Sequence, residues 1–277
     1  MQTTSDATHI APVRKAPYVQ AALPPDYWAT EQDAVIYTRR CLICAGVVFV
    51  AYGLNVAGAL PLAGLVLLGA LVLPRWMINL HELLHLYDDQ QIHPFIRLMG
   101  VSPLPISPIS LSYEQTRLLH AGHHAAPATE TDPDAYHIRG SWIGTLFNAF
   151  IAPEQSSLRW LMRHGLSRQL AVDMLIKLCL LVGLVWLGDR TFLWFWLSLR
   201  LVYGLSDFAF FRLVHHRKGD YGTFALSLPS VVVALGEFVF GKTVIQTTIH
   251  HDIHHQNPRI AARALASART HMEATAT

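Results

Sequence analysis

Charged side chains are scarce in this chain of 277 residues, of which only 14% are Asp, Glu, Lys or Arg and 52% are hydrophobic. Soluble domains carry about 25% charged residues, so the composition is that of a membrane protein. The net charge is only +2, and the basic residues are scattered along the chain. The basic face that a nucleic-acid-binding protein needs is therefore missing, which excludes nucleic acid as a partner.

Cysteine is almost absent as well, with three residues, Cys41, Cys44 and Cys179, all in apolar runs. No second pair accompanies the closely spaced Cys41 and Cys44, so we interpret them as small apolar side chains and not as a redox or metal motif. The sequence has no cysteine motif for haem or an iron–sulfur cluster and no glycine-rich flavin fingerprint. Any electrons that the protein uses must therefore come from another protein.

Long apolar segments are what the chain has in quantity. The run from Cys41 to Leu73 contains no charged residue and is longer than the about 20 residues that one membrane span needs. Asn55, Gly58 and Pro61 lie near its centre and favour a tight turn. The run therefore predicts two membrane helices joined as a hairpin.

Basic residues flank this hairpin. Arg39 and Arg40 precede it and Arg75 follows it, and the positive-inside bias places such flanks in the cytoplasm. Residues 1–33 before it are polar and punctuated by proline, which indicates a loose cytoplasmic arm and not a cleaved signal peptide. Both ends of the first hairpin are therefore expected on the cytoplasmic side.

Two further spans are expected at residues 170–188 and 191–211, separated by a short external turn at Asp189 and Arg190. The last apolar stretch, residues 223–241, is interrupted by a proline and a glutamate. A full crossing there would put the final histidines on the opposite membrane face. We therefore expect this stretch to be interfacial or re-entrant.

The polar middle of the chain, residues 86–168, contains two amphipathic segments, 142–153 and 157–166, which are expected at the membrane surface. Charged residues inside the spans are costly unless they face protein or water. The expected topology puts Lys177 and Asp207 at similar depth. We therefore predict that these two residues pair with each other and take no part in binding a substrate.

These segments together predict an all-α integral membrane protein. Four transmembrane helices would form two hairpins, and a histidine-rich helical cap would lie on the cytoplasmic side. The chain then divides into the arm at residues 1–33, a membrane domain at residues 34–260 and a C-terminal tail at residues 261–277.

Histidine is the residue that needs an explanation. Of sixteen histidines, five stand alone, among them His137, and eleven fall in four groups. The groups are HELLH (His81, His85), HAGHH (His120, His123, His124), VHHRKG (His215, His216) and HHDIHH (His250, His251, His254, His255). Residues three and four apart share one face of a helix. Each group is expected on the cytoplasmic side, three of them at the end of an apolar segment and the group of His120 after a polar one. We therefore expect the four groups to converge.

Imidazole binds iron, copper or zinc, whereas magnesium and calcium prefer oxygen ligands. Two, three, one and three ligands from the four groups make nine, more than the about four that one zinc takes. Nine ligands suit two ions with open positions. A pair of open-coordinated irons at a membrane surface is suited to O2 activation and to oxidation of an unactivated C–H bond. The ligand type alone leaves iron, copper and zinc open, and two Fe ions as cofactors with O2 as a co-substrate are the hypothesis that this chemistry favours.

The order HELLH, HAGHH and HDIHH, interleaved with hydrophobic hairpins over about residues 34 to 260, resembles the membrane fatty acid desaturase and hydroxylase superfamily, which includes alkane hydroxylases and carotenoid ketolases. The resemblance implies a histidine-ligated di-iron centre in a four-helix membrane fold. Carried over box by box, the implied metal ligands are His81, His85, His120, His123, His124, His251, His254 and His255.

The resemblance also implies one more ligand between the second and third boxes, often a histidine three residues before glycine. The stretch HRKG fits with His216, and the adjacent His215 stays an alternative. His250 is then spare, and a supporting or surface role suits it.

The activity that the resemblance implies is O2-dependent desaturation or hydroxylation of a long-chain fatty acyl or other lipid substrate. The enzyme would lie in the inner membrane with its active site on the cytoplasmic side, and an external donor of the ferredoxin, rubredoxin or cytochrome b5 type would supply electrons. The stretch HHAAPATETDPDAYH resembles carotenoid ketolases, so a carotenoid ketolase or hydroxylase is an alternative.

A rival interpretation is that HELLH is the H-E-x-x-H motif of a membrane zinc protease, with Glu82 as the general base and either Asp134 or a distant histidine as the further ligand. The other histidine groups would then have no purpose. A transporter with a histidine relay would place its polar groups at mid-membrane, not beyond the helix ends.

For Glu82 and Asp252, contact with a ligand histidine and solvent exposure are equally expected.

Overall fold

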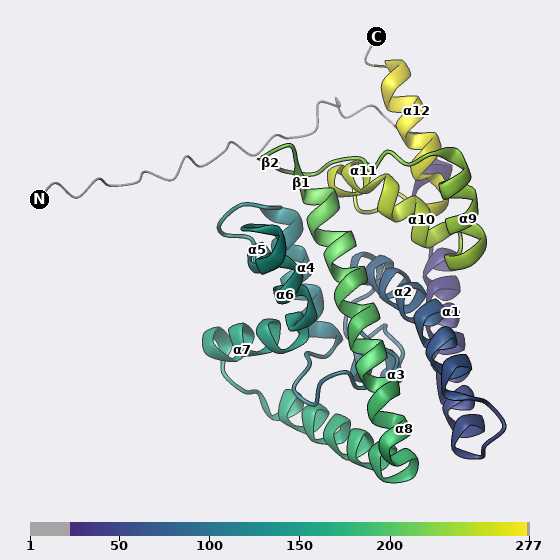
Figure 1. The fold of residues 1–277 in the computed structure, drawn as a ribbon. Helices are drawn as coiled ribbons and strands as arrows, with labels where there is room; N and C mark the ends of the chain where they lie inside the picture. The colour runs from purple at the N-terminus through teal and green to yellow at the C-terminus, as the bar shows by residue number, and fades with distance from the viewer. Residues whose placement is uncertain (1–22, 276–277) are drawn as a thin grey trace, which may run out of the picture.

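The described part of the chain is mostly helical, as the sequence predicts (Figure 1). The computed structural model describes residues 23–275. Its elements are η1 (Pro25–Tyr27), α1 (Glu31–Val56), α2 (Leu62–Leu86), α3 (Pro94–Met99), α4 (Tyr113–Ala125), α5 (Ala135–Ile138), α6 (Trp142–Phe150), α7 (Ala152–His164), α8 (Arg168–His215), β1 (His216–Arg217), β2 (Asp220–Tyr221), α9 (Ser230–Phe240), α10 (Lys242–Ile249), α11 (His251–Gln256), η2 (Ala262–Ala264) and α12 (Leu265–Thr275).

α1 and α2 form the predicted hairpin. A capping box begins α1, because the Thr30 side chain accepts from the Asp33 backbone N–H while Asp33 Oδ2 accepts from the Thr30 N–H at 2.9 Å. In the turn after α1, Gly58 has a φ of 76°, a conformation that suits glycine. The Asn55 side chain donates to the Leu60 carbonyl at 2.8 Å. The residues that predicted the turn are thus the ones that close it.

α8 is two helices joined at a turn. Asp189 has φ 47° and ψ −132°, which lie outside the helical region, and the chain changes direction there (Figure 1). This is the turn that Asp189 and Arg190 predicted. Just before it, the carbonyl of Leu184 accepts a hydrogen bond from the Tyr52 hydroxyl of α1, so the turn is tied to the first hairpin.

Three helices, α1, α2 and α8, are long and apolar enough to cross a membrane. α9 has only 11 residues and so is about 16 Å long, whereas the hydrocarbon core of a bilayer is about 30 Å thick. Its apolar side chains nevertheless remain outside the protein core, with Val231 at 72% and Phe238 at 86% exposed. Residues 223–241 therefore do not form a single spanning helix.

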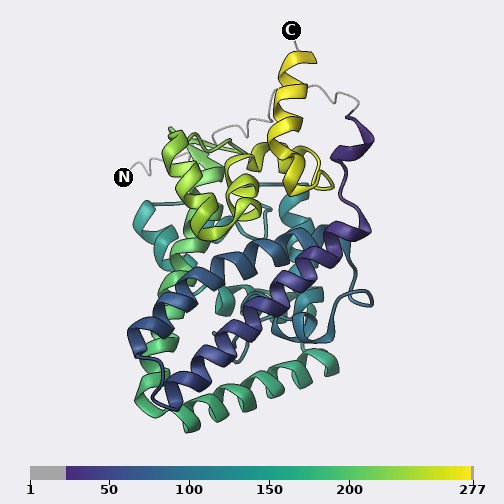
Figure 2. The ribbon, with the colours of Figure 1, turned by 90° about the vertical axis from the view of Figure 1, so that its right-hand side faces the viewer.

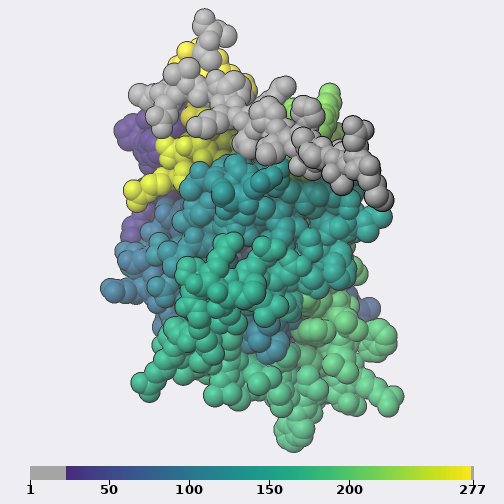
Figure 3. All heavy atoms as spheres, turned by 90° about the vertical axis from the view of Figure 1, so that its left-hand side faces the viewer, coloured from purple at the N-terminus to yellow at the C-terminus, as the bar shows by residue number. Residues whose placement is uncertain are grey.

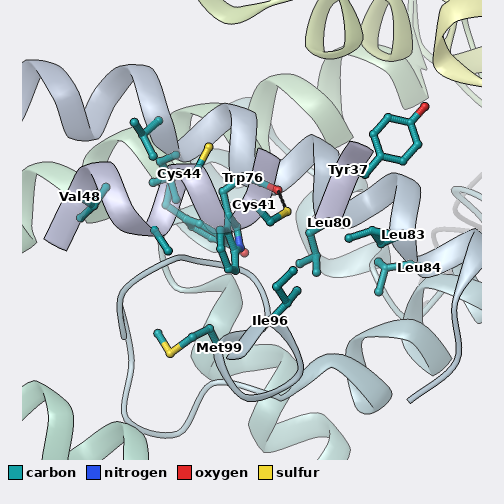
Figure 4. Close-up of a cluster of buried hydrophobic side chains, with 14 of the residues drawn as sticks. Tyr37, Cys41, Cys44, Val48, Trp76, Leu80, Leu83, Leu84, Ile96 and Met99 are labelled. Carbon is teal, nitrogen blue, oxygen red and sulfur yellow. Dashed lines mark hydrogen bonds between the residues drawn. The ribbon is translucent and has the colours of Figure 1, made fainter. Parts of the chain in front are cut away.

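The main apolar core lies where α1, α2 and α3 meet (Figure 4). Trp76 is fully buried there, and its indole N–H donates to the Gly100 carbonyl at 2.8 Å. Cys41 and Cys44 are free and buried in the same core, whereas Cys179 is exposed. The two buried cysteines act as small apolar side chains, as their sequence context predicts.

The segment between α3 and α8 covers one side of the molecule (Figure 3). Lys177 of α8 donates to carbonyls of the loop before α4, at 2.7 Å from Ser110 O and 3.1 Å from Leu111 O. Asp207 instead lies 2.7 Å from His137 Nδ1. The predicted pairing of Lys177 with Asp207 is therefore wrong, because the two halves of α8 face different neighbours.

The C-terminal elements return to the beginning of α1. Arg263 Nε donates to Asp33 Oδ1 at 3.0 Å, and Leu265 is fully buried in the main core. Residues 261–275, which the sequence alone suggests are a tail, thus pack on the same core as α1 and α2. Most of the predicted N-terminal arm, residues 1–22, lies outside the described residues.

Candidate metal centre

Nine histidines from four helices meet in two adjoining groups, within each of which the ring nitrogens lie within 4.8 Å of one another. α2, α4 and α11 supply eight of them, and the last residue of α8 supplies the ninth. The first group is His81, His85, His120, His124 and His254. The second group is His123, His215, His251 and His255.

Helix periodicity explains how one helix serves both groups. On α4, His120 and His124 are four residues apart and face the first group, whereas His123 faces the second. α11 divides its histidines in the opposite ratio, with one in the first group and two in the second. The ring of His124 stacks on that of His255 at a centroid distance of 4.0 Å. The two groups are therefore in direct contact.

In the first group, His85 Nε2 lies 2.9 Å from His120 Nε2 and 3.1 Å from His254 Nε2. The ring centroid of His81 lies 4.5 Å from that of His254, and the ring centroid of His124 lies 4.6 Å from that of His85. All five residues come from α2, α4 and α11. Their nitrogens point to one common space.

The second group is built in the same way around His215. Its Nε2 lies 3.2 Å from His123 Nε2 and 3.1 Å from His251 Nε2. His255 Nε2 lies 3.0 Å from His251 Nε2. Each group thus offers several lone pairs to one position.

These separations are those of ligands around a shared cation. A metal-bound imidazole nitrogen lies about 2.1 Å from the ion, so two ligands at right angles lie about 3.0 Å apart. The Nε2 separations here run from 2.9 to 3.2 Å. Without a proton or a cation between them, lone pairs at this distance repel each other. The residues present therefore fit a metal ion in each group.

Unpartnered nitrogens point to the same conclusion. Both ring nitrogens of His124 and Nε2 of His81 are buried and have no hydrogen-bond partner. A buried polar atom without a partner costs about 1–3 kcal/mol. Coordination of a metal ion would remove that cost.

Burial keeps the rings neutral. Burial, followed by the neighbouring histidines, lowers the pKa of His120, His251 and His254 well below its ordinary range. A neutral imidazole has the free lone pair that a metal requires, whereas an imidazolium has none. The groups are therefore ready to bind a metal at neutral pH.

Two partners fix the rings of the second group from behind. Asp132 Oδ2 lies 2.8 Å from His123 Nδ1, and the same carboxylate accepts from the backbone N–H of Asp134 at 2.8 Å. His215 Nδ1 donates to the Gly222 carbonyl at 2.8 Å. Such partners hold a ring in one orientation and leave the opposite nitrogen for the metal.

The first group has one such partner. Glu82 is only 4% exposed, lies 3.3 Å from His81 Nδ1 and accepts from the Thr247 hydroxyl at 3.0 Å. Of the two positions expected for Glu82, the structure shows the one beside the histidine. Asp252 is also buried, but it pairs with Arg269 and not with a ring of the centre.

His216 lies outside both groups, although the sequence pattern favoured it over His215. α8 ends at His215, and at His216 the backbone becomes extended, with φ −137° and ψ 124°. The His216 ring therefore turns away and packs against Trp142 and Tyr221, at centroid distances of 5.9 and 5.0 Å. Of these two histidines, only His215 lies in one of the groups.

His250, the spare histidine, lies beside the centre but outside both groups. Its Nδ1 accepts from Arg269 Nε at 2.9 Å. Burial, followed by the charge of Arg269, lowers the pKa of His250 to about 4. This contact joins the start of α11 to α12, so the expected supporting role agrees with its position.

An apolar cavity of about 300 Å³ adjoins the first group. His81 and His120 lie in its wall, together with apolar side chains such as Ile78, Leu84 and Phe210. None of the four histidines of the second group lines it. Only the first group therefore has access to a molecule in this cavity.

His137 also lines the cavity, although it stands alone in the sequence. Its Nδ1 lies 2.7 Å from Asp207 Oδ2, and its Nε2 lies 3.6 Å from Asp134 Oδ1. Although burial lowers the pKa of His137, the carboxylates of Asp207 and Asp134 raise it to about 10. The sequence feature that could have pointed to His137 is Asp207, because an acidic residue inside an apolar segment needs a cationic partner.

The centre thus offers two adjoining cation sites beside an apolar space. Its ligands suit iron, copper or zinc. No known protein family, curated protein or solved structure matches the chain. The function therefore has to be inferred from these residues.

Proposed function

We propose that this protein is a membrane di-iron oxidase that uses O2 to desaturate or hydroxylate a long-chain fatty acyl or other lipid substrate. The observation that supports the proposal most directly is the pair of adjoining histidine groups, the first of which lies in the wall of an apolar cavity. The order of the histidine boxes, which resembles the membrane desaturase and hydroxylase superfamily, supports the same conclusion.

The number of ligands supports two redox-active ions. Five histidines in the first group and four in the second exceed what a single zinc takes, which is about four. When bound, two iron ions would supply the chemistry that reduces O2 and oxidises a C–H bond. His81, His85, His120, His124 and His254 would hold one of them, and His123, His215, His251 and His255 the other.

The chain's own residues would bind the substrate and exclude water. Met77, Ile78 and Phe210 line the cavity, and such side chains favour an apolar chain over water. His81 and His120 lie in the same wall, so a chain in the cavity lies beside the first group. The position of its C–H bonds decides between loss of a second hydrogen and addition of a hydroxyl group.

Electrons would come from a separate protein of the ferredoxin, rubredoxin or cytochrome b5 type. The sequence has no haem, iron–sulfur or flavin motif of its own. Reduction of O2 while a substrate is oxidised requires two further electrons in this class of reaction. The donor is therefore an obligatory partner.

The proposed topology has four spans with the metal centre on the cytoplasmic side of the inner membrane. α8 has 48 residues, which would be about 72 Å as one straight helix against about 30 Å of hydrocarbon. The turn at Asp189 divides it into two helices of spanning length. Arg39, Arg40 and Arg75, by the positive-inside bias, favour the cytoplasm for the histidine end.

The test is metal content together with product analysis. We expect the full chain, purified from iron-replete cells, to hold about two irons as measured by plasma mass spectrometry. With a reducing system and a lipid or carotenoid feed, it should form a product that is absent when O2 is excluded. One zinc per chain, or products that form equally without O2, would contradict the proposal.

Two alternatives lead to different results. A carotenoid ketolase or hydroxylase would give the same iron content but would act on the carotenoid feed. A zinc protease would use His81 and His85 with one further ligand and would hold one zinc per chain. Asp134 lies with His123 and Asp132, whereas the distant histidines His120 and His254 lie beside His81 and His85. Glu82, the expected base of such a protease, already contacts His81 and Thr247.

A further inference from the structure

The helices α1 and α2 lie side by side (Figure 2). A second cavity is lined by residues of these two helices and of the junction between α9 and α10. Its volume is about 380 Å³, and none of the nine clustered histidines lines it. Three basic residues do, namely Arg40, Arg75 and Lys242, and no acidic residue is part of its lining. The cavity is therefore positively charged.

The two arginines are held in place by neutral groups. Arg75 donates from Nε to the Phe240 carbonyl at 3.0 Å and from Nη2 to the Val239 carbonyl at 2.6 Å. Arg40 Nη1 donates to the Thr243 hydroxyl at 2.6 Å. Among residues 23–275, no carboxylate forms a recorded ion pair with either arginine or with the lysine. Hydrogen bonds thus hold the two arginine side chains in place, but no carboxylate neutralises their charges.

An unpartnered acceptor lies in the same cavity. Asn79 is only 3% exposed and lines the cavity. Its Nδ2 donates to the Arg75 carbonyl at 2.6 Å, whereas its Oδ1 has no hydrogen-bond partner. A buried acceptor in this state is stabilised by a ligand that brings a hydroxyl or amine donor.

One wall of the cavity is apolar and partly exposed. Ile43 and Val47 of α1 are 56% and 37% exposed, and Leu68 and Leu71 of α2 continue the same wall. α1 and α2 are both candidate membrane spans. A ligand of this cavity therefore meets cations at one end and a lipid-facing helix surface at the other.

We propose that this cavity binds an anionic phospholipid of the surrounding bilayer. Arg40, Arg75 and Lys242 would bind the phosphodiester, since arginine and lysine bind phosphate through charge-assisted hydrogen bonds. A headgroup hydroxyl would donate to Asn79 Oδ1, and an acyl chain would lie along Ile43 and Val47. Phosphatidylglycerol has all three features, because it joins a phosphodiester to a headgroup with free hydroxyls.

The proposal is tested on the purified full chain by native mass spectrometry after titration with phosphatidylglycerol or phosphatidylcholine. We expect retained phosphatidylglycerol and much less phosphatidylcholine. Replacing Arg40 or Lys242 by glutamine should weaken retention about fivefold each. Arg39→Gln is the matched control, because Arg39 precedes Arg40 on α1 but does not line the cavity.

The outcomes separate the possible ligands. Equal retention of the two lipids, or equal losses in the Arg39 and Arg40 variants, would overturn the proposal. Displacement of the lipid by millimolar inorganic phosphate would show a free-anion site and would also overturn it. Arg75→Gln is less suitable alone, since Arg75 also binds carbonyls at the end of α9. The measurement needs neither metal nor turnover, so its result is independent of the proposed oxidase activity.

Discussion

The two histidine groups share helices but not surroundings. The first reaches the apolar cavity through His81 and His120, whereas no member of the second lines it. The second group is instead held from behind, by Asp132 at His123 and by a backbone carbonyl at His215. One group is open to a substrate and the other is enclosed and rigidly oriented. We infer that the substrate reacts beside the first group while the second completes the centre.

The largest effect is expected from loss of a ligand in either group. His254→Ala removes a ring of the first group and His123→Ala one of the second, so both variants should lose bound iron and all turnover. Iron analysis and product assays measure this. His216→Ala is the matched control and should keep its iron, because its ring lies outside both groups. Unchanged activity in either ligand variant would contradict the assignment.

The next largest effect is expected in the cavity wall. His137→Gln leaves Asp207 buried without its partner, which should lower the free energy of unfolding by about 3–5 kcal/mol. The raised pKa of His137, about 10, also sets a pH dependence. Protonated His137 contributes its full stabilisation below a pH of about 6.5, which is the pKa of histidine in the unfolded chain. This contribution is lost as the pH rises through 10.

Thermal unfolding in detergent at pH 7 and pH 10 checks this expectation. The wild-type protein should lose more stability between the two values than the double variant His137→Gln, Asp207→Asn, in which neither member of the ion pair remains. An equal pH response in both proteins would show that the pair does not contribute in this way.

A smaller effect is expected from the support of the second group. Asp132→Asn keeps the shape of the side chain but removes the charge behind His123. Removal of such partners weakens metal binding about 10–100-fold. At limiting iron, the variant should therefore hold less iron than wild type. Retention of full iron in competition with a chelator would falsify the role given to Asp132.

A change in the residues that support His81 of the first group should have a smaller effect than Asp132→Asn. Thr247→Val removes the hydroxyl that donates to Glu82 at 3.0 Å, which is worth about 1 kcal/mol. Glu82 itself lies 3.3 Å from His81 Nδ1, so the ring is less firmly held than His123. Iron content should stay near wild type and only the melting temperature should fall. A loss of iron as great as in Asp132→Asn would remove the contrast between the groups.

A substitution inside the cavity should have the smallest effect on bound iron. It should nevertheless change the substrate selectivity. Ala209 lines it, so Ala209→Leu should narrow the space without reaching any histidine. Iron content should not change, while chain length or position in the product mixture should shift. Mass spectrometry of products from mixed lipids detects the change. An unaltered product pattern would place the substrate elsewhere.

Features that depend on a few consecutive residues could be predicted from the sequence. The turn around Gly58 and the shared face of His120 and His124 are of this kind. The choice of His215 over His216 could not be predicted, because it depends on where α8 ends and on the short β1–β2 hairpin that follows.

Contacts between segments that are distant in the sequence could not be predicted either. His137 and Asp207 are 70 positions apart, and no local pattern joins them. The partner of Lys177 was missed for the same reason, since it is a loop 67 positions earlier in the chain. Burial of the C-terminal helix on the core likewise depends on packing that composition does not reveal.

Because α4 and α11 each extend rings into both groups, neither ion could bind without ordering part of the other's shell. The first ion would hold both helices in place and so increase the affinity for the second, which is positive cooperativity between metals. Loading should then follow a sigmoidal isotherm, with few molecules that carry a single iron. A cell with too little iron would then contain a mixture of metal-free protein and protein with two irons. The concentration of available iron would set the ratio of the two forms.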